Sequence, residues 1–503
     1  MSDSILESPF IRDKVQKLPY SFVKERGILA LEESEENVLV ALADPLQLDA
    51  LEEARTLLGK PLREQLVSHT LLEEAIELCY HQKESATSDL LATLQKDTKQ
   101  ENQESEGAEY DLLEDRSTSP VIRLLNSLLS EAIVQGASDI HFEPVEKGIS
   151  VRYRIDGILQ MRHAPPKEFQ APLLTRIKVI AKLDIAEQRL PQDGRIKLKM
   201  GGREIDFRVS TIPVVHGERI VLRILDKTNV LLGMHKLGMR QKILESFKHL
   251  LHLSEGIILV TGPTGSGKTT TLYSALSEIN SSETNIMTIE DPVEYKLHGM
   301  AQMGVNPKIH LHFATGLRHI LRQDPDVIMI GEVRDKETAE IAIQASLTGH
   351  LVLTTLHTND APSALTRLVE MGIEPYLLSS SVVGVLAQRL VRTICKECIE
   401  SYEPTDIELK ELGIAIKTPF FRGRGCANCY DSGYKGRHGI YELMLVDSSI
   451  KRQLLNSADA LALKTCAQNG GMMSLRHEGG FLVIQGITTS AEVLRVSRSA
   501  EEV

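Results

Sequence analysis

Long apolar runs are missing from this sequence. No stretch reaches the ~18 uninterrupted apolar residues that a membrane-spanning helix needs. Residues 1–14 carry charges early and contain no apolar h-region, so we expect no signal peptide. The sequence therefore predicts a protein that is made and kept in the cytoplasm. Any attachment to a membrane is expected to be peripheral and to run through partner proteins.

An excess of basic residues is also missing. The formal net charge is −12 at pH 7, and the pI is about 5.8. This charge balance argues against a protein that coats nucleic acid. It does not exclude a basic groove on part of the surface. Cysteine is scarce, with six residues in 503. In a reducing compartment we expect none of them to form a structural disulfide. Tryptophan is absent too, which excludes no class of protein.

The length and the patterning divide the chain into parts. A chain of 503 residues is too long for one hydrophobic core, so three or four domains are expected. An apolar run at 38–43 predicts a buried strand, and helical patterns follow at 48–58 and 70–81. Seven acidic residues and no basic one stand between Glu101 and Asp115, which predicts a flexible linker. The predicted parts are an N-terminal α/β domain at 1–83, an acidic linker at 84–116, a second domain at 117–230 and a third at 235–503.

The second domain begins at a clear helix signal. Ser119 suits the cap, Pro120 the first helical position and Gly136 the stop. Strand patterns follow, in part with apolar and charged residues alternating, so that one face of the strand is buried and one is wet. The predicted strands are 151–157, 203–210 and 220–225. A helix followed by strands predicts an α+β domain.

The third domain alternates strand and helix patterns, which predicts a parallel sheet with helices on both faces. An apolar run at 257–260 leads into GxxxxGK[ST] at 262–269, and a helix follows. Glycines let backbone N–H groups surround phosphate oxygens, while Lys268 reaches the β- and γ-phosphates of ATP and Thr269 offers a hydroxyl to Mg²⁺. The residues expected to hold the nucleotide are Gly262, Pro263, Thr264, Gly265, Ser266, Gly267, Lys268, Thr269 and Thr270. A glycine-rich turn that fits by chance is the alternative.

Two further strand ends carry carboxylates. Glu332 follows a buried strand, and Gly331 stands where a metal-binding Asp is often found. Glu332 is therefore expected to orient the attacking water or to hold Mg²⁺ through water. Glu290 or Glu294 is a second candidate for a share of this role. A capped turn before Pro292 is an equally open interpretation.

A third polar strand end carries His357. In a doubly wound sheet this end would lie beside the phosphates, where a histidine can donate a hydrogen bond to the γ-phosphate. A lone histidine is more often structural. Its occurrence with two other polar strand ends favours a place in the active site.

Four cysteines form two CxxC pairs, Cys395 with Cys398 and Cys426 with Cys429. Two such pairs can complete a tetrahedral Zn²⁺ site, and the segment 395–440 has few core residues of its own. We therefore predict a structural zinc subdomain there. Redox pairs or cysteines without a metal are the alternatives. The remaining cysteines, expected to be core residues, are Cys79 and Cys466.

Several motifs together carry a family resemblance. The loop GPTGSGKTT, the box TIEDPVE, the strand DVIMIGEVRD and the box TGHLVLTTLHTN occur in this order, after ASDIHFEP at 137–144 and RLPQDGR at 189–195. They resemble the secretion ATPases of the type II secretion and type IV pilus systems over at least residues 117–503. AlaAspPro at 43–45 and the cysteine pairs favour the type II branch, and pilus assembly ATPases are the alternative.

The resemblance implies an α/β multidomain protein. Its parts would be a RecA-like P-loop ATPase core with a parallel sheet, a preceding α+β domain, a small N-terminal α/β domain and an inserted zinc subdomain with four cysteines. It also implies an ATP-hydrolysing motor that powers pseudopilus assembly and the export of folded proteins across the outer membrane. The motor would be a homo-hexamer at the inner membrane. Residues 1–83 would bind the cytoplasmic domain of an anchor protein, and an inner-membrane platform protein would be a second partner.

In this family the nucleotide lies between the core and the second domain, whose arginines reach the phosphates. Arg208 and Arg223 match those positions best. Further candidates in the core are Arg318, Arg322, Arg334 and Arg367. A DNA translocase of the same fold is a competing function that the acidic balance disfavours, and no nucleic-acid partner is expected. A nucleotide-gated scaffold without hydrolysis is disfavoured by the presence of Lys268 and Glu332. A GTPase is disfavoured because no NKxD motif is found.

Overall fold

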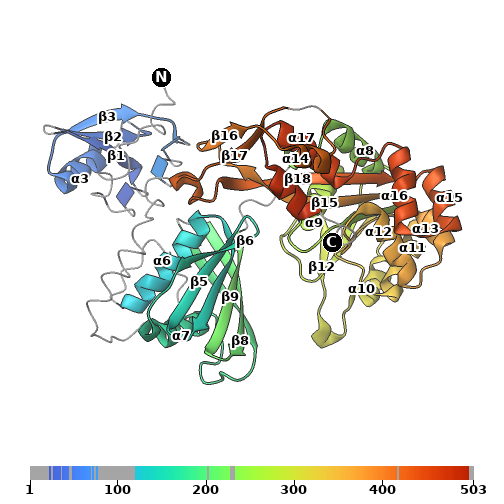
Figure 1. Ribbon diagram of the computed structural model, residues 1–503. Helices are drawn as coiled ribbons and strands as arrows, with labels where there is room; N and C mark the ends of the chain where they lie inside the picture. The colour runs from blue at the N-terminus through green and yellow to red at the C-terminus, as the bar shows by residue number, and fades with distance from the viewer. Residues whose placement is uncertain are drawn as a thin grey trace. The chain divides into compact units, whose positions relative to one another are not determined.

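The computed structural model separates into two compact units, Met1–Thr228 and Asn229–Val503 (Figure 1). We describe each by itself. The described residues are 18, 22–23, 26–34, 37–44, 48–69, 71–72, 75–76, 119–200, 203–226, 233–415 and 418–497. The predicted acidic linker at 84–116, Cys79 and most of the helix predicted at 70–81 lie outside these residues.

The N-terminal part of the first unit is a small β-α-β arrangement. Strand β1 (Ile28–Glu33) pairs antiparallel with β2 (Val38–Leu42), and helix α3 (Leu48–Leu58) then leads to β3 (Leu62–Leu66), which pairs parallel with β2. The strand predicted at 38–43 and the helix predicted at 48–58 are confirmed. The apolar residues of β2 and of the inner face of α3 share one buried cluster, which holds the sheet and the helix together.

The described residues within 119–226 of the first unit form a six-stranded antiparallel sheet with two α-helices, and the strand order of the sheet is β6-β5-β4-β9-β8-β7. Side chains alternate across it: Phe207 is buried against the helices, whereas the neighbouring Arg208 lies on the opposite face. The predicted α+β character and the three predicted strands are confirmed. The elements are α6 (Pro120–Val134), β4 (Ala137–Val145), β5 (Gly148–Ile155), β6 (Ile158–His163), η2 (Lys167–Phe169), α7 (Gln170–Ile180), β7 (Gln192–Met200), β8 (Arg203–Val214) and β9 (Gly217–Asp226).

Helix α6 begins and ends where the sequence predicts. Pro120 occupies the first turn, and Gly136 follows the helix with φ of +66°. Ser119 occupies the cap position, but its side chain makes no capping hydrogen bond to the helix. The fixed φ of proline and the left-handed conformation open to glycine therefore account for the two ends.

The second unit is built on a seven-stranded sheet in the order β12-β11-β13-β14-β10-β15-β18. The first six strands are parallel, and β18 pairs antiparallel with β15. The strands are β10 (Gly256–Thr261), β11 (Ile286–Glu290), β12 (Ala301–Gly304), β13 (Val327–Ile330), β14 (Leu351–Leu356), β15 (Val382–Ile394) and β18 (Tyr434–Leu445). The parallel sheet predicted for this part is confirmed.

Helices cover both faces of this sheet, as predicted. Alternate residues of β10 point into two separate cores: Ile257 into one, and Ile258 into the other, which contains the apolar face of α9. Burial on both faces explains why β10 reads as a continuous apolar run. The helices are η3 (Met234–Lys236), α8 (Gln241–Leu251), α9 (Lys268–Ile279), η4 (Pro307–Ile309), α10 (Phe313–Ile320), α11 (Lys336–Leu347), α12 (Ala361–Glu370), α13 (Pro375–Ser381), α15 (Ser448–Asn456), α16 (Ala460–Asn469), α17 (Leu475–Ile484) and α18 (Ser490–Ser497).

A small subdomain is inserted between β15 and β18. It contains β16 (Ile399–Tyr402), α14 (Asp406–Leu412), β17 (Phe420–Gly423) and η5 (Ala427–Cys429), and β16 and β17 form an antiparallel hairpin (Figure 1). Its α14 begins with a capping box in which Thr405 and Glu408 bond reciprocally. Among the described residues, no helix combines the length and the apolarity that a bilayer crossing requires.

Candidate functional site

Four polar segments meet at one edge of the second unit's sheet. The phosphate-loop residues 262–267 follow β10, Glu290 ends β11, Glu332 follows β13 by two residues, and His357 follows β14 directly. These four strands are consecutive neighbours in the order β11-β13-β14-β10 and run parallel. Their carboxyl ends therefore lie side by side, which is where open α/β sheets bind ligands.

The glycines of the loop adopt conformations that other residues rarely adopt. Gly265 and Gly267 have φ of +79° and +87°, and Gly262 has φ of +154°. A Cβ atom at Gly262 would lie 2.5 Å from the backbone oxygen of Gln388 and 2.6 Å from Oγ of Ser266. The loop thus needs glycine both for its turns and for its close packing.

The loop has the features of a phosphate cradle. Lys268 Nζ donates hydrogen bonds to the backbone oxygens of Gly262, at 2.7 Å, and of Pro263, at 3.2 Å, so the ammonium lies over the loop. Oγ of Ser266 is buried with no hydrogen-bond partner among the described residues. The first turn of α9 adds free N–H groups and Thr269, whose side chain is exposed. These groups fit a nucleotide's phosphates and a bound Mg²⁺.

The charge of Lys268 is affected by its surroundings. Burial lowers its pKa to about 8, the positive charge of Arg389 acts in the same direction, and Glu332 opposes both. The mutual influence of Lys268 and Glu332 is evidence that these two predicted site residues lie in one electrostatic neighbourhood. An anion bound at the loop would favour the charged amine.

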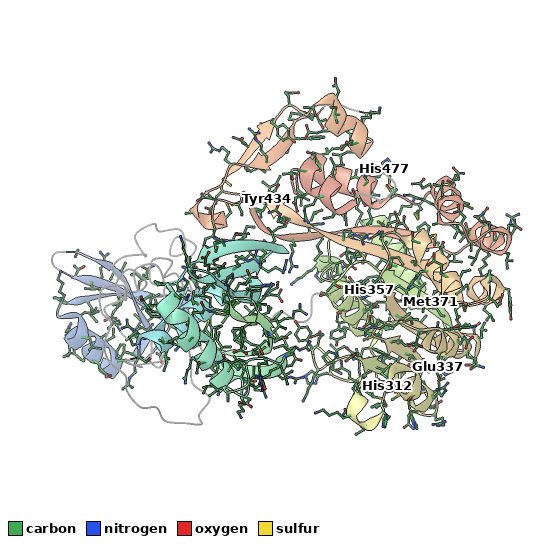
Figure 2. All side chains as sticks on the ribbon, turned by 60° about the horizontal axis from the view of Figure 1, so that its bottom comes forward. His312, Glu337, His357, Met371, Tyr434 and His477 are labelled. Atoms are coloured by element: carbon green, nitrogen blue, oxygen red, sulfur yellow. The ribbon has the colours of Figure 1, made fainter. Side chains whose placement is uncertain are left out.

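The carboxylate of Glu332 contacts two side chains, those of Arg334 and His357. Its Oε1 accepts a hydrogen bond from Arg334, and its Oε2 lies 3.5 Å from Nε2 of His357. Burial lowers the pKa of His357, and the charge of Lys268 lowers it further, while Glu332 acts in the opposite direction. The structure therefore brings Lys268, Glu332 and His357 together (His357 is labelled in Figure 2).

Glu290 lies in a buried network of hydrogen bonds. Its carboxylate is 3% exposed and accepts hydrogen bonds from Tyr273, from Thr288 at 2.6 Å and from Gln302 at 3.1 Å. Three hydrogen bonds from the protein thus hold this carboxylate at the end of β11. The same tyrosine oxygen accepts a hydrogen bond from the backbone N–H of Glu294 at 3.3 Å.

Two neighbouring residues of β15 contact the site but gave no signal in the sequence. Gln388 donates a hydrogen bond to the backbone oxygen of Ser266 at 2.7 Å and accepts one from Thr271 at 2.7 Å. Arg389 donates to the backbone oxygen of Asn359 at 2.6 Å. Both side chains are buried. Each contact joins segments far apart in the chain, so no local pattern announces it.

The predicted arginines Arg208 and Arg223 lie in the other compact unit, on neighbouring strands β8 and β9. They are register partners, and Arg195 of β7 is paired with Arg208, so three arginines form a row across the sheet. Arg223 Nε donates to Asp139 at 2.9 Å and keeps 58% of its side chain exposed. Arg195 is the last residue of the motif RLPQDGR at 189–195, but no role in the site was predicted for it.

Of the four further arginine candidates, only Arg334 bonds a site residue. Arg318 pairs with Glu337, which lies well away from His357 in Figure 2. Arg367 pairs with Glu370, three residues away on its own helix. Arg322 contacts His319. These three are exposed surface contacts, which contribute little to stability.

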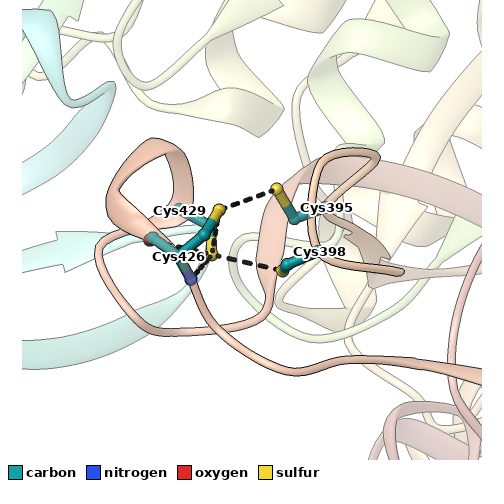
Figure 3. Close-up of side chains that lie close together, drawn as sticks. All are labelled: Cys395, Cys398, Cys426 and Cys429. Atoms are coloured by element: carbon teal, nitrogen blue, oxygen red, sulfur yellow. Dashed lines mark hydrogen bonds between the residues drawn. The ribbon is translucent and has the colours of Figure 1, made fainter. Parts of the chain in front are cut away.

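The four cysteines converge as predicted (Figure 3). Their Sγ atoms all lie within 4.8 Å of one another, with 3.8 Å between Cys395 and Cys426, 3.8 Å between Cys398 and Cys429, and 3.6 Å between Cys426 and Cys429. Four sulfurs at ~2.3 Å from a central zinc stand roughly 3.8 Å apart. The arrangement therefore fits a tetrahedral zinc and is too wide for disulfides. Cys466 lies outside this cluster, packed against the core.

Comparison with known proteins adds a family context. The family model described as type II/IV secretion system protein matches residues 114–495, and the MshEN domain model matches residues 6–86. The chain is 48% identical over 486 residues to the type II secretion system protein E of Pseudomonas aeruginosa, with 96% of each chain covered. It is 46% identical over 498 residues to the type II secretion system ATPase E of Vibrio cholerae, covering 98% of this chain and 99% of that protein.

Proteins of pilus systems are also similar. The type IV pilus assembly ATPase PilB of Myxococcus xanthus is 43% identical over 488 residues, which cover 96% of this chain and 86% of PilB. The solved structure of the pilus retraction motor PilT with bound ADP matches with a TM-score of 0.51 and 28% identity. That match covers 75% of this chain and 98% of PilT.

Proposed function

Because the chain belongs to the type II/IV secretion system protein family, we propose a role for each part of its site. The chain is an ATP-hydrolysing motor of type II protein secretion. Relatives of 46–48% identity over nearly the whole length bear the names type II secretion system protein E and type II secretion system ATPase E. The observation that carries the site assignment is the meeting of Lys268, Glu332 and His357 beside the glycine loop at one sheet edge.

Residues 262–270 bind the polyphosphate of ATP. Backbone N–H groups of the loop and of the first turn of α9 donate to phosphate oxygens, and Lys268 turns from the loop carbonyls toward the β- and γ-phosphates. The hydroxyl of Thr269 would hold Mg²⁺, which would supply positive charge next to the phosphates. The unpartnered hydroxyl of Ser266 and the positive φ of Gly265 and Gly267 support this assignment.

Glu332 orients the attacking water. It is the carboxylate next to Lys268 that the protein leaves partly open, since its contacts within the unit are with Arg334 and His357. His357 donates a hydrogen bond to the γ-phosphate. Its lowered pKa means that the imidazole is mostly neutral at pH 7, so one ring nitrogen can donate while the other accepts.

Glu290 acts through its neighbours rather than on the water. The three hydrogen bonds to its carboxylate fix Tyr273 of α9 and Thr288 of β11. Helix α9 begins at the phosphate loop, so this network holds the loop's helix against the sheet. We therefore assign Glu290 a positioning role.

The arginine row of the first unit supplies the remaining catalytic candidates. Arg208 and Arg223 stabilise the charge of the transferring phosphoryl group, which arginines in such positions do with large effects on rate. Arg195 belongs to the same row by strand register and is a third candidate. The chain works as a homo-hexamer, so that these arginines serve the ATP site of the same or a neighbouring subunit.

The proposed division of the chain follows from these roles. Residues 117–230 form the arginine-bearing domain and residues 235–503 the ATPase domain. Residues 1–83, tethered by the acidic segment 84–116, bind the cytoplasmic part of an inner-membrane anchor protein, and an inner-membrane platform protein is the second partner. The protein then works in the cytoplasm, peripherally attached to the inner membrane. Its product is mechanical work on pseudopilus assembly, with no nucleic acid involved.

A structural zinc holds the subdomain at 395–440. The four thiolates of Cys395, Cys398, Cys426 and Cys429 would form a closed shell, which is the form of structural rather than catalytic sites. Backbone N–H groups of Cys426 and Gly433 donate to the sulfur of Cys429, which favours its thiolate form.

Pilus assembly is the alternative function, supported by the 43% identity to PilB. The relatives of higher identity and fuller coverage are type II secretion proteins, which favours secretion. Complementation separates the two: the gene should restore protein export to a secretion strain that lacks its ATPase, and should not restore pili to a pilus strain.

The proposed catalytic roles are tested by two matched glutamine variants. Glu332→Gln should bind ATP as the wild type does and should lose turnover by about a hundredfold or more, because the carboxylate that orients the attacking water is gone. Glu290→Gln should lose less turnover and should lower the melting temperature, because its amide N–H₂ would face other donors. Normal hydrolysis by Glu332→Gln together with an inactive but stable Glu290→Gln would reverse the two roles.

A further inference from the structure

A buried carboxylate joins two helices, one of which follows the segment that carries His357. Glu442 lies on β18 with 1% of its surface exposed. Its Oε1 accepts a hydrogen bond from the backbone N–H of Ala361 at 2.8 Å, and its Oε2 accepts one from Leu475 at 3.3 Å. Ala361 and Leu475 are the first residues of α12 and α17, so one side chain fixes the start of both helices.

Helix α12 is the direct continuation of the loop that carries His357. Within that loop, Thr358 is held by Thr261 at the end of β10: the Thr358 N–H donates to Oγ1 of Thr261 at 2.9 Å. Asn359 is held through its backbone oxygen by Arg389. The contact of Glu442 with Ala361 is thus a third attachment of the segment 357–361, at the end away from the phosphate loop.

The charges that face Glu442 come from three elements. Asp360 lies at the cap of α12, Lys464 lies on α16, and Arg389 lies on β15. Lys464 and Asp360 approach each other at 3.8 Å. Among the described residues Glu442 itself has no ion pair, so its carboxylate depends on the two helix N–H groups for stabilisation. N–H groups at a helix start favour a negative charge at this place.

We infer that Glu442 is a positioning residue for ATP hydrolysis, one that fixes the start of α12 and thereby holds His357 beside Glu332 and Lys268. This inference rests on the proposed ATPase role of those residues. A carboxylate is needed rather than an amide, because the side chain must accept hydrogen bonds from the N–H groups of Ala361 and Leu475 at the same time, one on each oxygen. A protonated or amidated side chain has one good acceptor oxygen and would leave one buried N–H unsatisfied, which is costly.

The protonation of Glu442 gives this role a pH signature. Burial raises its pKa to about 7, although the N–H groups of Ala361 and Leu475 and the charge of Lys464 oppose the shift. As pH falls through this value, the carboxylate gains a proton and loses one of its two acceptor contacts. Turnover should therefore fall on the acid side near pH 7. His357 titrates at lower pH because its own pKa is lowered.

The test compares Glu442→Gln with Glu492→Gln in the full-length protein. Glu492 is a matched control, since it is equally buried but bonds Arg392 and Arg495, away from the loop. At saturating ATP, kcat of Glu442→Gln should fall about tenfold or more while KM for ATP stays within about threefold, because positioning rather than binding is lost. The fall of kcat below about pH 7, which we call the acid limb of the pH profile, should disappear in Glu442→Gln. Glu492→Gln should keep both the wild-type kcat and the acid limb.

Three results would overturn the inference: wild-type kcat in a folded Glu442→Gln, an unchanged acid limb in that variant, or an equal loss of kcat in a folded Glu492→Gln. If Glu442→Gln does not fold, Glu442→Asp replaces it. Aspartate keeps the charge with a shorter reach, so kcat should fall while the acid limb remains, and wild-type kcat would again contradict the inference. Lys268→Ala in the same assay separates a failure of this inference from a failure of the proposed ATP site. Normal turnover of Lys268→Ala would refute the ATP site itself.

Discussion

The amide nitrogen of Gln388 lies 2.7 Å from the backbone oxygen of Ser266, although 122 residues separate them in the chain. The same side chain accepts a hydrogen bond from Thr271 in the first turns of α9. One glutamine of β15 thus fixes both the phosphate loop and the helix that follows it. The side chain of Gln388 lies so close to the loop that a Cβ atom at Gly267 would lie 2.7 Å from its amide nitrogen.

Gln388→Ala should therefore weaken ATP binding. It removes the hydrogen bonds of Gln388 with the oxygen of Ser266 and with the hydroxyl of Thr271 in a buried place, at a cost of ~1–3 kcal/mol. We expect the Kd for ATP to rise about tenfold, as measured with a fluorescent ATP analogue. Gln453→Ala is the control, because Gln453 makes its contact on α15, outside the site. An unchanged Kd in a folded Gln388→Ala would show that the loop holds its shape unaided.

The kcat/KM for ATP should decrease at alkaline pH. Burial lowers the pKa of Lys268 to about 8. Below that pH the amine is charged and attracts the phosphates; as pH rises through it, the charge is lost and kcat/KM declines, since this parameter reports the free enzyme. Lys268→Arg, whose guanidinium stays charged, should lack this limb whatever its absolute rate. A flat wild-type profile up to about pH 9.5 would contradict the assignment.

Elemental analysis should find one Zn²⁺ per chain. Replacing Cys426 and Cys429 by Ser should release it and should increase proteolysis and hydrogen exchange within 395–440, because such a subdomain depends on its metal for much of its stability. Cys466→Ser is the control and should keep the zinc, since Cys466 lies on α16 outside the cluster. Native protein without metal and with four freely reactive thiols would refute the site.

Mixing two inactive variants tests whether the arginines act between subunits. Lys268→Ala and Arg208→Ala should each be inactive alone, and mixed rings should regain part of the activity, because some sites then have an intact loop and an intact arginine. Specific activity of the wild type should also rise with protein concentration as rings form. Two results together would remove the case for a ring motor: no recovery on mixing, and activity that does not depend on concentration in a monomer with ATP bound.

The features that the sequence predicted are those with local causes. The phosphate loop is recognisable because its backbone shape demands glycine at particular positions, directly after a buried strand. The cysteine pairs are recognisable because each knuckle sets its own spacing. The parallel sheet follows from the alternation of apolar runs and helical patterns, and strand order then brings Glu332 and His357 to the loop.

The features that the sequence did not predict depend on distant contacts. Nothing near Gln388 or Glu442 in the chain marks them, since their partners come from other elements of the fold. Glu290 was one candidate for a share in catalysis because it ends a strand, and its hydrogen bond with Tyr273 of α9 is a contact that the sequence did not predict. Whether a carboxylate at a strand end is free to act as a base depends on the residues that surround it in the folded protein. A local sequence pattern does not contain that information.

The ATP turnover of Lys268→Ala is the most direct test of the account. We predict a folded protein whose turnover is at least about a hundredfold below the wild type, and which fails to restore secretion, because the charge at the β- and γ-phosphates is gone. Lys248→Ala, which removes a surface lysine paired with Glu278, should keep wild-type turnover. Turnover of pure Lys268→Ala within about tenfold of the wild type would contradict the active site described above.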